Sequence, residues 1–241
     1  MSRVFVEIDL SQAESRFVAL AACEDTLINM LVNKQDIHRF VAAEIFQKPM
    51  AEITHEERQL GKKSSHGANY GMGVSTFQDS CLKELDLVID RKMATRVLES
   101  YHLVFPRIRT WHAQLRDTVY RERKLVNPFG ATRYFYGRIC DDTYRQAYAW
   151  LPQSTIPMLT NHLMLALCDQ RSAGKLDFWL HAQIHDSVLL SCKQDQVSAI
   201  AAFAFTSANW HPTITLPAGK LIIPCDLKYG RNLGQLKKYT T

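Results

Sequence analysis

The sequence predicts an α+β fold in which an antiparallel sheet is combined with a mainly helical block. A run of β-branched and aromatic residues at about 3 to 9 is followed by helical patterns that continue to about residue 125. Two further strand-like runs, at about 176 to 184 and 187 to 192, flank a short turn at His185-Asp186. Because these runs are short and separated by a turn, we expect them to form a hairpin that joins the first strand in one sheet.

The N-terminal half contains one strand and then helices. Asp9 closes the strand, and prolines predict breaks between the helices near Pro49 and at Phe105-Pro106, because proline lacks an N–H group and clashes with the preceding turn. One helix in this block is expected to begin near Thr54 and to run past Tyr70.

The C-terminal half returns to the sheet. After a turn at Pro128-Phe129-Gly130, a short strand is expected around Arg133 to Tyr136, and then a long helical stretch that Pro152 and Pro157 interrupt. The hairpin that follows places Asp186 at its turn, facing the first strand, and a terminal helix and strand complete the sheet.

Two acids stand at strand ends, Asp9 and Asp186. Taken alone, each is more often a solvated strand end than a ligand, since acids favour the surface. A pair of carboxylates with open coordination positions also suits Mg²⁺, which takes its remaining ligands from water or phosphate. Such a pair could hold two ions about 3.5 to 4 Å apart, an arrangement found in phosphoryl-transfer enzymes.

A basic and aromatic face is predicted on the helix near residue 60. Arg58, Lys62, His66 and Tyr70 recur every four residues, so their side chains share one broad helical face. The two cations could hold a triphosphate, while the two rings offer flat surfaces to a base. The alternative is a solvated charged face, the usual meaning of such a pattern.

Composition is consistent with a globular protein that binds polyanions. The 241 residues are 46% hydrophobic and carry a formal net charge of +5, which favours polyanions but does not require them. The six cysteines and nine histidines show no zinc-site spacing. We expect no signal peptide and no membrane span, and a cytoplasmic location.

The three segments together resemble motifs A, B and C of the family A DNA polymerases, which include bacterial DNA polymerase I and related phage enzymes. Residues 9–16 resemble motif A, residues 58–71 motif B, and His185-Asp186 motif C, in the family order and at family-like spacing. Further family-like elements are Asp36-Ile37-His38, Phe105-Pro106, residues 129–133 and residues 152–155. The resemblance covers nearly the whole chain.

The resemblance implies a right-hand polymerase without its thumb and exonuclease domain. Residues 1–34 would belong to the palm with motif A, residues 35–125 would form helical fingers with motif B, and residues 126–241 would return to the palm with motif C. The implied activity is template-directed addition of deoxynucleotides to a primer 3′-hydroxyl by two-metal nucleotidyl transfer.

Specific roles follow from the resemblance. Asp9, Asp186 and the backbone carbonyl of Leu10 would bind two Mg²⁺ ions, for which Mn²⁺ is a possible substitute. Lys62 would be the third catalytic residue, protonating the pyrophosphate leaving group. Glu14 would act as a steric gate against the 2′-hydroxyl. The implied nucleotide-binding residues are Leu10, Gln12, Glu14, His38, Arg58, Lys62, His66 and Tyr70, and the implied DNA-binding residues are Gly71, Arg133, Arg145, Gln153 and His185.

Three positions depart from the family pattern. His66 stands where the family usually has Phe or Tyr, Ser187 replaces a glutamate after the motif C aspartate, and Ala149 stands where asparagine is common. None of these changes removes an implied metal ligand. From His66 we expect altered sugar discrimination and nucleotide binding that depends on pH.

The position of Asp9 is the largest departure, because only eight residues precede it. The thumb, the first palm segment and an exonuclease domain precede motif A in the family. We therefore expect one half of a split polymerase, of phage or viral origin, completed by a second polypeptide that supplies the thumb and the remaining palm. An experimental fragment and a minimal enzyme are the alternatives.

Functions of other classes remain open from the sequence. A metal-dependent nuclease could use the two acids but would not need the triphosphate face. A catalytically inactive DNA-binding relative could keep the basic surface, although retention of both acids would then be unexplained. An enzyme that makes or copies RNA would use the same chemistry, and only Glu14 argues for deoxynucleotides.

Overall fold

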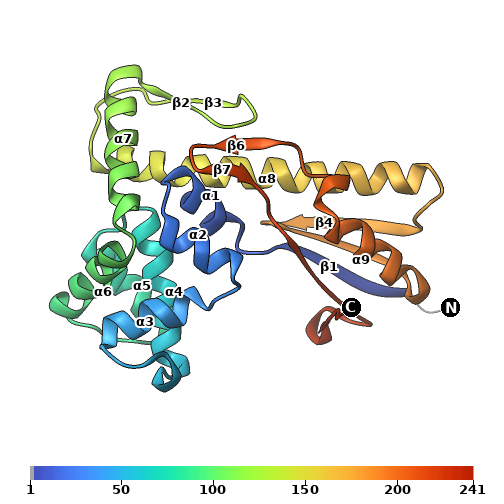
Figure 1. Cartoon of the computed structure of the whole chain (residues 1–241), viewed down its shortest axis with the longest axis horizontal. Coiled ribbons are helices and arrows are strands. Elements are labelled where there is room, and N and C mark those ends of the chain that lie inside the picture. The colour runs from blue at the N-terminus through green and yellow to red at the C-terminus, as the bar shows by residue number, and fades with distance from the viewer. Residues whose placement is uncertain (1–2, 241) are drawn as a thin grey trace. The chain divides into compact units, whose positions relative to one another are not determined.

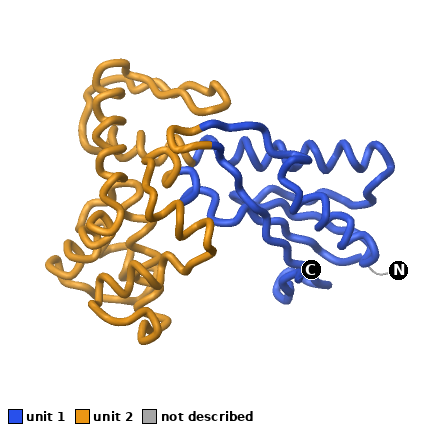
Figure 2. Tube along the Cα trace, viewed as in Figure 1, with its two compact units in different colours: residues 1–17, 153–215, 220–241 blue, residues 18–152, 216–219 orange. Residues whose placement is uncertain are grey.

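A computed structural model describes residues 3–240 and confirms the α+β class with an antiparallel sheet (Figure 1). The chain divides into two compact units. Unit 1 contains residues 1–17, 153–215 and 220–241, and unit 2 contains residues 18–152 and 216–219 (Figure 2). The predicted palm and fingers boundaries stay predictions, and residues 35–125 lie entirely within unit 2.

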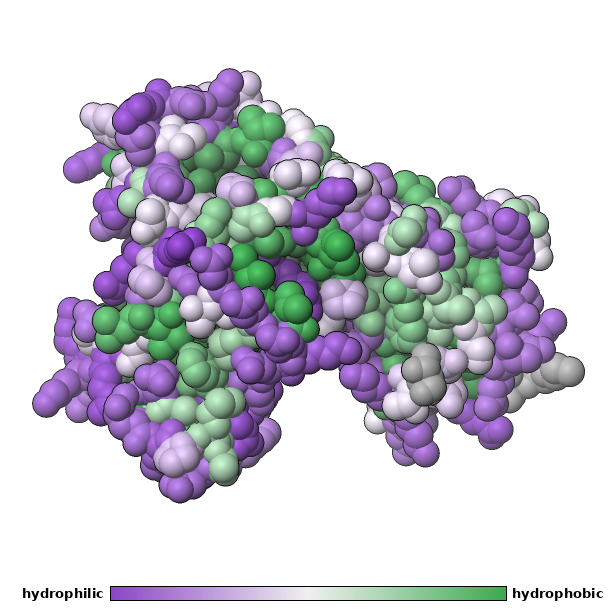
Figure 3. All heavy atoms as spheres, viewed as in Figure 1, coloured by the Kyte–Doolittle hydropathy of each residue, from purple (hydrophilic) through white to green (hydrophobic). Residues whose placement is uncertain are grey.

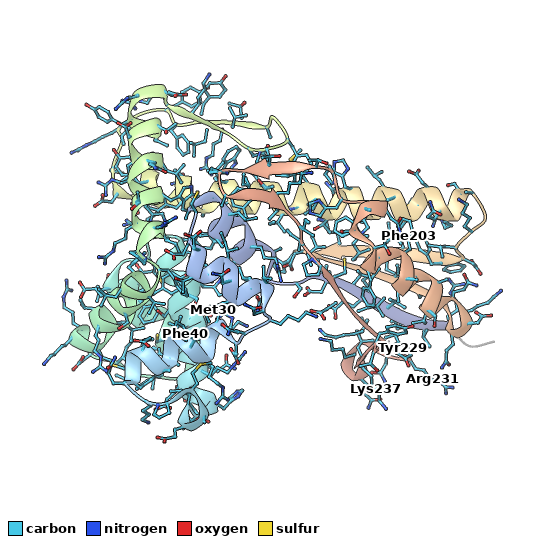
Figure 4. The ribbon with its side chains drawn as sticks, viewed as in Figure 1. Met30, Phe40, Phe203, Tyr229, Arg231 and Lys237 are labelled. Carbon is cyan, nitrogen blue, oxygen red and sulfur yellow. The ribbon has the colours of Figure 1, made fainter. Side chains whose placement is uncertain are left out.

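Unit 1 is built on a five-stranded sheet with the order β4-β5-β1-β8-β9, in which all neighbours are antiparallel. Its strands are β1 (Arg3–Leu10), β4 (Phe178–Ile184), β5 (Ser187–Lys193), β8 (Cys225–Gly230) and β9 (Lys237–Lys238). The predicted first strand and hairpin are therefore confirmed. Tyr229 and Lys237, which pair across β8 and β9, are labelled in Figure 4.

The central strand β1 alternates strictly between a buried and a half-buried face. Val4, Val6, Ile8 and Leu10 are all buried, because successive side chains of a strand point to opposite sides of the sheet. The other face contains Asp9, and its opposite neighbours in the ladders are Ser187 of β5 and Asp226 of β8. Burial of the even-numbered residues thus fixes the face on which Asp9 lies.

Two helices lie along this sheet (Figure 1). Helix α9 (Val197–Phe205) contacts β8, and the later part of α8 (Asp141–Ser172) belongs to the same unit. The prediction that Pro152 and Pro157 interrupt this helical stretch is wrong, because α8 is continuous over 32 residues. Apolar side chains from Tyr148 to Leu167 are buried along it, and this tertiary packing holds the turns on both sides of each proline despite the lost hydrogen bonds.

Unit 2 is mainly helical. Helix α1 is divided between the two units, since its residues 18–21 lie in unit 2 and its residues 13–17 in unit 1. The helices are α1 (Ala13–Ala21), α2 (Asp25–Val32), α3 (Ile37–Phe46), α4 (His55–Asn69), α5 (Val74–Leu85), α6 (Arg91–Val104) and α7 (Pro106–Glu122). The expected breaks near Pro49 and at Phe105-Pro106 are confirmed. Figure 4 labels Met30 on α2 and Phe40 on α3.

Helix α4 has a clear beginning and end. Thr54 caps it through a capping box, because its hydroxyl accepts from Glu57 N at 3.2 Å and the Glu57 carboxylate accepts from Thr54 N at 2.9 Å. The prediction that the helix runs past Tyr70 is wrong: the helix ends at Asn69. Gly71 then takes a φ of +65°, and Gly71 N and Met72 N donate to the carbonyls of Ala68 and Gly67, a Schellman closure.

A small antiparallel hairpin follows α7. It consists of β2 (Lys124–Val126) and β3 (Thr132–Tyr134), so the short strand expected near Arg133 is present. A second small hairpin joins β6 (Ile214–Leu216) to β7 (Gly219–Leu221). Within residues 3–240, no helix is both long enough and apolar enough to cross a membrane.

Candidate active site

The two strand-end acids of unit 1 are brought together by the sheet. Ser187, the residue after Asp186, pairs directly with Asp9 in the β1–β5 ladder. Leu10 N also donates a hydrogen bond to the carbonyl oxygen of Asp186 at 3.1 Å. Asp186 follows His185 in the two-residue turn between β4 and β5, and His185 takes the left-handed conformation with φ of +55°, as the first residue of a primed hairpin turn does. The predicted position of Asp186 is confirmed.

The environment of Asp9 disfavours its charged form. Burial first, and then the negative charge of Asp186, raise the pKa of the Asp9 carboxyl from 3.8 to about 6. Directly across the ladder stands Asp226, and like charges at such positions destabilise a sheet. Asp226 is compensated by an ion pair with Lys238 at 2.8 Å, which with a hydrogen bond from Ser11 keeps the pKa of Asp226 low.

These residues fit a divalent cation of the Mg²⁺ type. No group of three or more His, Cys, Asp or Glu side chains in the described chain could hold a metal by itself. Mg²⁺ needs only one or two carboxylates when water and substrate phosphate complete its shell. The repulsion between Asp9 and Asp186 is the electrostatic signature that such a cation would relieve.

The other predicted residues of motif A lie just beyond β1. The side chain of Leu10 is fully buried, so only its backbone is available to a ligand. Gln12 is exposed with a φ of +51°, and Glu14 stands half-buried in the first turn of α1. Ser11 N donates to Pro224 O at 2.9 Å, and Arg16 Nε donates to Ser11 O at 3.1 Å, so the bend that carries Gln12 is tied to both of its neighbours.

Unit 2 gathers a cluster of basic side chains where α3 meets α4. Arg58 Nε donates to Asp36 Oδ2 at 2.7 Å, and the same carboxylate caps α3 by accepting from Arg39 N at 3.1 Å. Burial alone would raise the pKa of Asp36, but these hydrogen bonds hold it below its usual value. Asp36 thus keeps its charge and fixes the direction of the Arg58 guanidinium.

His38 lies within the field of this cluster. Burial, and then the charge of Arg58, lower the pKa of its imidazole from 6.5 to about 4, with smaller contributions from His66 and Lys62. His38 Nδ1 is buried, and within residues 3–240 it has no hydrogen-bond partner. The ring is therefore neutral at physiological pH and can offer a hydrogen bond to a bound group without adding charge.

Lys62 and His66 are exposed on α4 and line a cavity of about 400 Å³ beside α5. Lys63 and Glu84, which also line it, form an ion pair. The four predicted residues of the helical face thus divide into a half-buried, fixed Arg58, two exposed groups at the cavity, and Tyr70 at the helix end. This arrangement of positive and aromatic groups suits a polyphosphate attached to a flat base.

The end of α4 is anchored by a buried polar network. Asn69 Oδ1 accepts from the Tyr101 hydroxyl at 2.7 Å, and Asn69 O lies 2.9 Å from His112 Nε2. The His112 ring stacks on Tyr148, with centroids 3.9 Å apart and planes at 11°. A Cβ at Gly71 would meet the same Tyr148 ring at 3.0 Å. These contacts hold the Tyr70-Gly71 segment in one conformation.

The predicted DNA-binding residues divide between the two units. In unit 2, Arg133 donates to Gln146 Oε1 at 2.6 Å and Arg145 pairs with Asp142. In unit 1, Gln153 is exposed on α8 and His185 is exposed at the hairpin turn. Each unit therefore has its own members of the predicted set.

Sequence reasoning missed several residues that shape these sites. They are Asp226 opposite Asp9, Asp36 as the partner of Arg58, and the network of Asn69, Tyr101, His112 and Tyr148. Only Asp36 had a usable signal, since an acid directly before a helix predicts a cap. The others depend on contacts between segments far apart in the sequence.

Comparison with known proteins shows which family the chain resembles. A family model described as "DNA polymerase family A" matches residues 1–235. DNA polymerase I of Aquifex aeolicus is 24% identical over 219 residues, covering 91% of this chain and 36% of that protein. DNA polymerase I of Caldicellulosiruptor bescii is 32% identical over 202 residues, covering 80% of this chain and 23% of that protein.

A solved structure has the same fold. It is described as the POL domain of Pol1 from M. smegmatis in complex with DNA primer-template and dNTP, and it superposes with a TM-score of 0.77 at 22% identity. The alignment covers 95% of this chain and 39% of that one. With the family match over residues 1–235, it leads to one conclusion: this chain belongs to DNA polymerase family A.

Proposed function

We propose that this chain supplies the catalytic part of a DNA-directed DNA polymerase, which transfers deoxynucleotides to a primer 3′-hydroxyl. The observation that carries the proposal is the pairing of Asp9 and Asp186 at one end of the β1–β5 ladder, with the pKa of Asp9 raised. Two carboxylates that repel each other in a partly buried site are costly unless they serve a cation.

In the proposed reaction the primer 3′-oxygen attacks the α-phosphorus of the triphosphate, and pyrophosphate leaves. Asp9, Asp186 and the Leu10 carbonyl would hold two Mg²⁺ ions, which would activate the 3′-hydroxyl and stabilise the charge on the phosphates. Glu14 and Gln12 would face the sugar and favour deoxynucleotides. Mn²⁺ would serve as a substitute ion.

The basic cluster of unit 2 would bind the triphosphate. Arg58, oriented by Asp36, would contact phosphate oxygens through its free N–H groups, and the orphan Nδ1 of neutral His38 would take part in a further hydrogen bond. Lys62, exposed at its cavity, would protonate the departing pyrophosphate. His66 and Tyr70 would offer their rings to the base.

DNA contacts and architecture complete the proposal. Gly71, Arg133, Arg145, Gln153 and His185 would contact primer or template. The division of the chain into two compact units supports assignment of unit 1 to the palm. It also supports assignment of residues 35–125, which lie in unit 2, to the fingers. Association with a second polypeptide that supplies the thumb and remaining palm stays a prediction, and copurification of such a partner with the tagged chain would test it.

The test is extension of a labelled primer-template by one nucleotide with Mg²⁺. Wild-type chain, alone or with its partner, should extend the primer only when the matching deoxynucleotide is present, and Asp186→Asn should abolish extension. The matched control is Asp195→Asn, which makes the same chemical change at an exposed acid of unit 1 outside the site. Shortening of the primer without nucleotides would instead indicate a nuclease, and DNA binding without extension would indicate an inactive relative.

A further inference from the structure

The hairpin after α7 concentrates much of the positive charge of the chain. Residues 121–138 contain five basic residues and one acidic residue, a formal net charge of +4 compared with +5 for all 241 residues. The hairpin extends from the end of α7 (Figure 1). Hydrophilic side chains gather along the outer edge of this part of the surface (Figure 3). Such a local excess attracts polyanions through release of their counterions.

The hairpin presents two tyrosine rings on its outward face. Leu125 and Phe135 are buried, whereas Tyr134 is 55% and Tyr136 is 85% exposed, because side chains alternate along an extended segment. The two exposed rings stack, with centroids 5.9 Å apart and planes at 19°. Val126, on the same face of β2, is also exposed. Adjacent exposed rings of this kind form an apolar surface that can bind a ligand.

Two exposed basic residues lie close to the tyrosines along the hairpin segment and are available to phosphates. Lys124 lies directly opposite Tyr134 in the β2–β3 ladder, and Arg138 follows Tyr136 by two residues. In the part of the chain that the structure describes, neither side chain forms an ion pair. Arg123 and Arg133 face other groups, since Arg123 donates to Gly137 O at 2.7 Å and Arg133 to Gln146.

The hairpin is rigid enough to present these groups in a fixed arrangement. Asn127 is buried, and its Oδ1 accepts from Phe129 N and Ala131 N, both at 3.0 Å. Its backbone N donates to Ala131 O at 2.9 Å, and Phe135 N donates to Arg123 O at 2.8 Å. A platform that is already ordered loses less conformational entropy when a ligand binds.

We propose that the outward face of this hairpin, formed by Lys124, Tyr134, Tyr136 and Arg138, is a stacking platform for an unpaired polynucleotide strand. Bases would stack on the two tyrosine rings, and the two cations would contact the phosphates between them. Stacking on aromatic rings tolerates every base, so binding would be independent of sequence. The proposal goes beyond the polymerase function, because the platform needs neither metal ion nor nucleotide.

The test measures fluorescence anisotropy of labelled oligothymidylate with the full-length chain in EDTA, without nucleotides. We expect Tyr134→Ala with Tyr136→Ala to weaken binding by at least about tenfold, since stacking contributes about 1–3 kcal/mol per base. Replacement of both tyrosines by Phe should keep nearly wild-type affinity, because the rings remain. Unlabelled single-stranded RNA should compete as well as unlabelled single-stranded DNA, because stacking does not depend on the sugar.

Charge variants test the cations separately. Lys124→Gln with Arg138→Gln should make the slope of log affinity against log salt concentration less steep, by the amount expected for the loss of about two phosphate contacts. Lys83→Gln with Lys92→Gln, which removes two charges from exposed positions of α5 and α6, is the matched control and should leave the salt dependence unchanged. Melting temperatures equal to wild type establish that every variant is folded.

Two results would overturn the proposal. One is absence of oligonucleotide binding by the wild type, and the other is unchanged affinity in the double alanine variant, which would place the oligonucleotide elsewhere on the chain. Because the measurement uses EDTA, a failed primer-extension assay does not affect either result, and Asp186→Asn should bind the oligonucleotide like wild type.

Discussion

The strongest structural prediction concerns Gly61, where α4 crosses α3. A Cβ placed on Gly61 would lie 2.2 Å from the carbonyl oxygen of His38 and 3.1 Å from Ala42 Cβ. The obstacle is helical backbone, so no rotamer change can relieve it. An ordinary contact of 3.4 Å would require α3 and α4 to separate by about 1.2 Å, the difference between 3.4 and 2.2 Å.

Two opposing free energies decide the effect of Gly61→Ala. Helix propensity favours alanine over glycine by about 0.8–1.0 kcal/mol. Overpacking in a close-packed interior costs about 1–3 kcal/mol, and a clash with backbone belongs at the upper end of that range. We therefore expect a net destabilisation of about 2 kcal/mol. The separation would also move His38 away from Arg58, so nucleotide binding should weaken.

Gly67, in the same helix, provides the matched control. A Cβ there would meet Met72 Sδ and Phe77 Cδ2 at 3.4 Å and Leu98 Cδ2 at 3.5 Å, all ordinary side-chain contacts. Gly67→Ala should therefore keep its propensity gain and be neutral or more stable by up to about 1 kcal/mol. The same chemical change thus has opposite signs at two positions six residues apart.

Urea unfolding followed by far-UV circular dichroism measures both variants. Because the chain has two compact units, hydrogen exchange of the α3 and α4 amides should be measured as well, to show where in the chain stability is lost. We expect faster exchange in α3 and α4 for Gly61→Ala and unchanged or slower exchange for Gly67→Ala. A Gly61→Ala protein as stable as Gly67→Ala would refute the reasoning, since it would mean that the two helices can separate at no cost.

Three further predictions follow from the site. Asp186→Asn should stabilise the metal-free protein by on the order of 1 kcal/mol, because it removes a charge that repels Asp9. Mg²⁺ should raise the melting temperature of the wild type more than that of the variant. An Asp186→Asn protein less stable than Asp195→Asn would contradict this. Asp36→Asn should keep the helix cap but lose the ion pair with Arg58. Its loss of stability should exceed that of Asp90→Asn by about 0.5–1 kcal/mol, since Asp90 caps α6 without an arginine partner in the described chain. Asp36→Asn should also raise the nucleotide KM several-fold, and a KM equal to that of the wild type would show that Asp36 does not orient Arg58. Burial lowers the pKa of His112 to about 4, so between pH 6.5 and 4 the unfolded chain binds a proton on this ring and the folded chain does not. Its stabilising contribution, present above pH 6.5, is lost as the pH falls toward 4, by at most about 3 kcal/mol. The variant His112→Phe should reduce that slope in unfolding titrations, and an unchanged slope would mean that the ring is protonated when folded.

Much of the secondary structure and the chemistry of the residues could be read from the sequence, because these depend on local patterns. Thr54 predicts the start of α4, the prolines predict the breaks before η1 (Met50–Glu52) and α7, and the apolar runs around Asp186 predict a hairpin. The type and order of Asp9, Arg58, Lys62 and Asp186 also indicated the family, because carboxylates suit a metal ion and cations suit phosphates.

Local reasoning was wrong where tertiary packing overrides it. Pro152 and Pro157 should break a helix, yet α8 continues through both because its apolar side chains are buried on either side. The predicted helix past Tyr70 ends at Asn69 because Gly71 adopts a positive φ and closes a Schellman motif. In both cases a side-chain pattern alone cannot show which backbone conformation the surroundings favour.

The sequence by itself determined which chemical groups this protein can use and which family it belongs to. Only the tertiary structure decided that Asp226 faces Asp9, that Gly61 touches the His38 carbonyl, and that Asn69 and His112 hold the end of α4. The physical reason is that strand register, helix crossing and buried hydrogen bonds each join segments that are distant in the chain. Their free energies exist only once those segments have packed together.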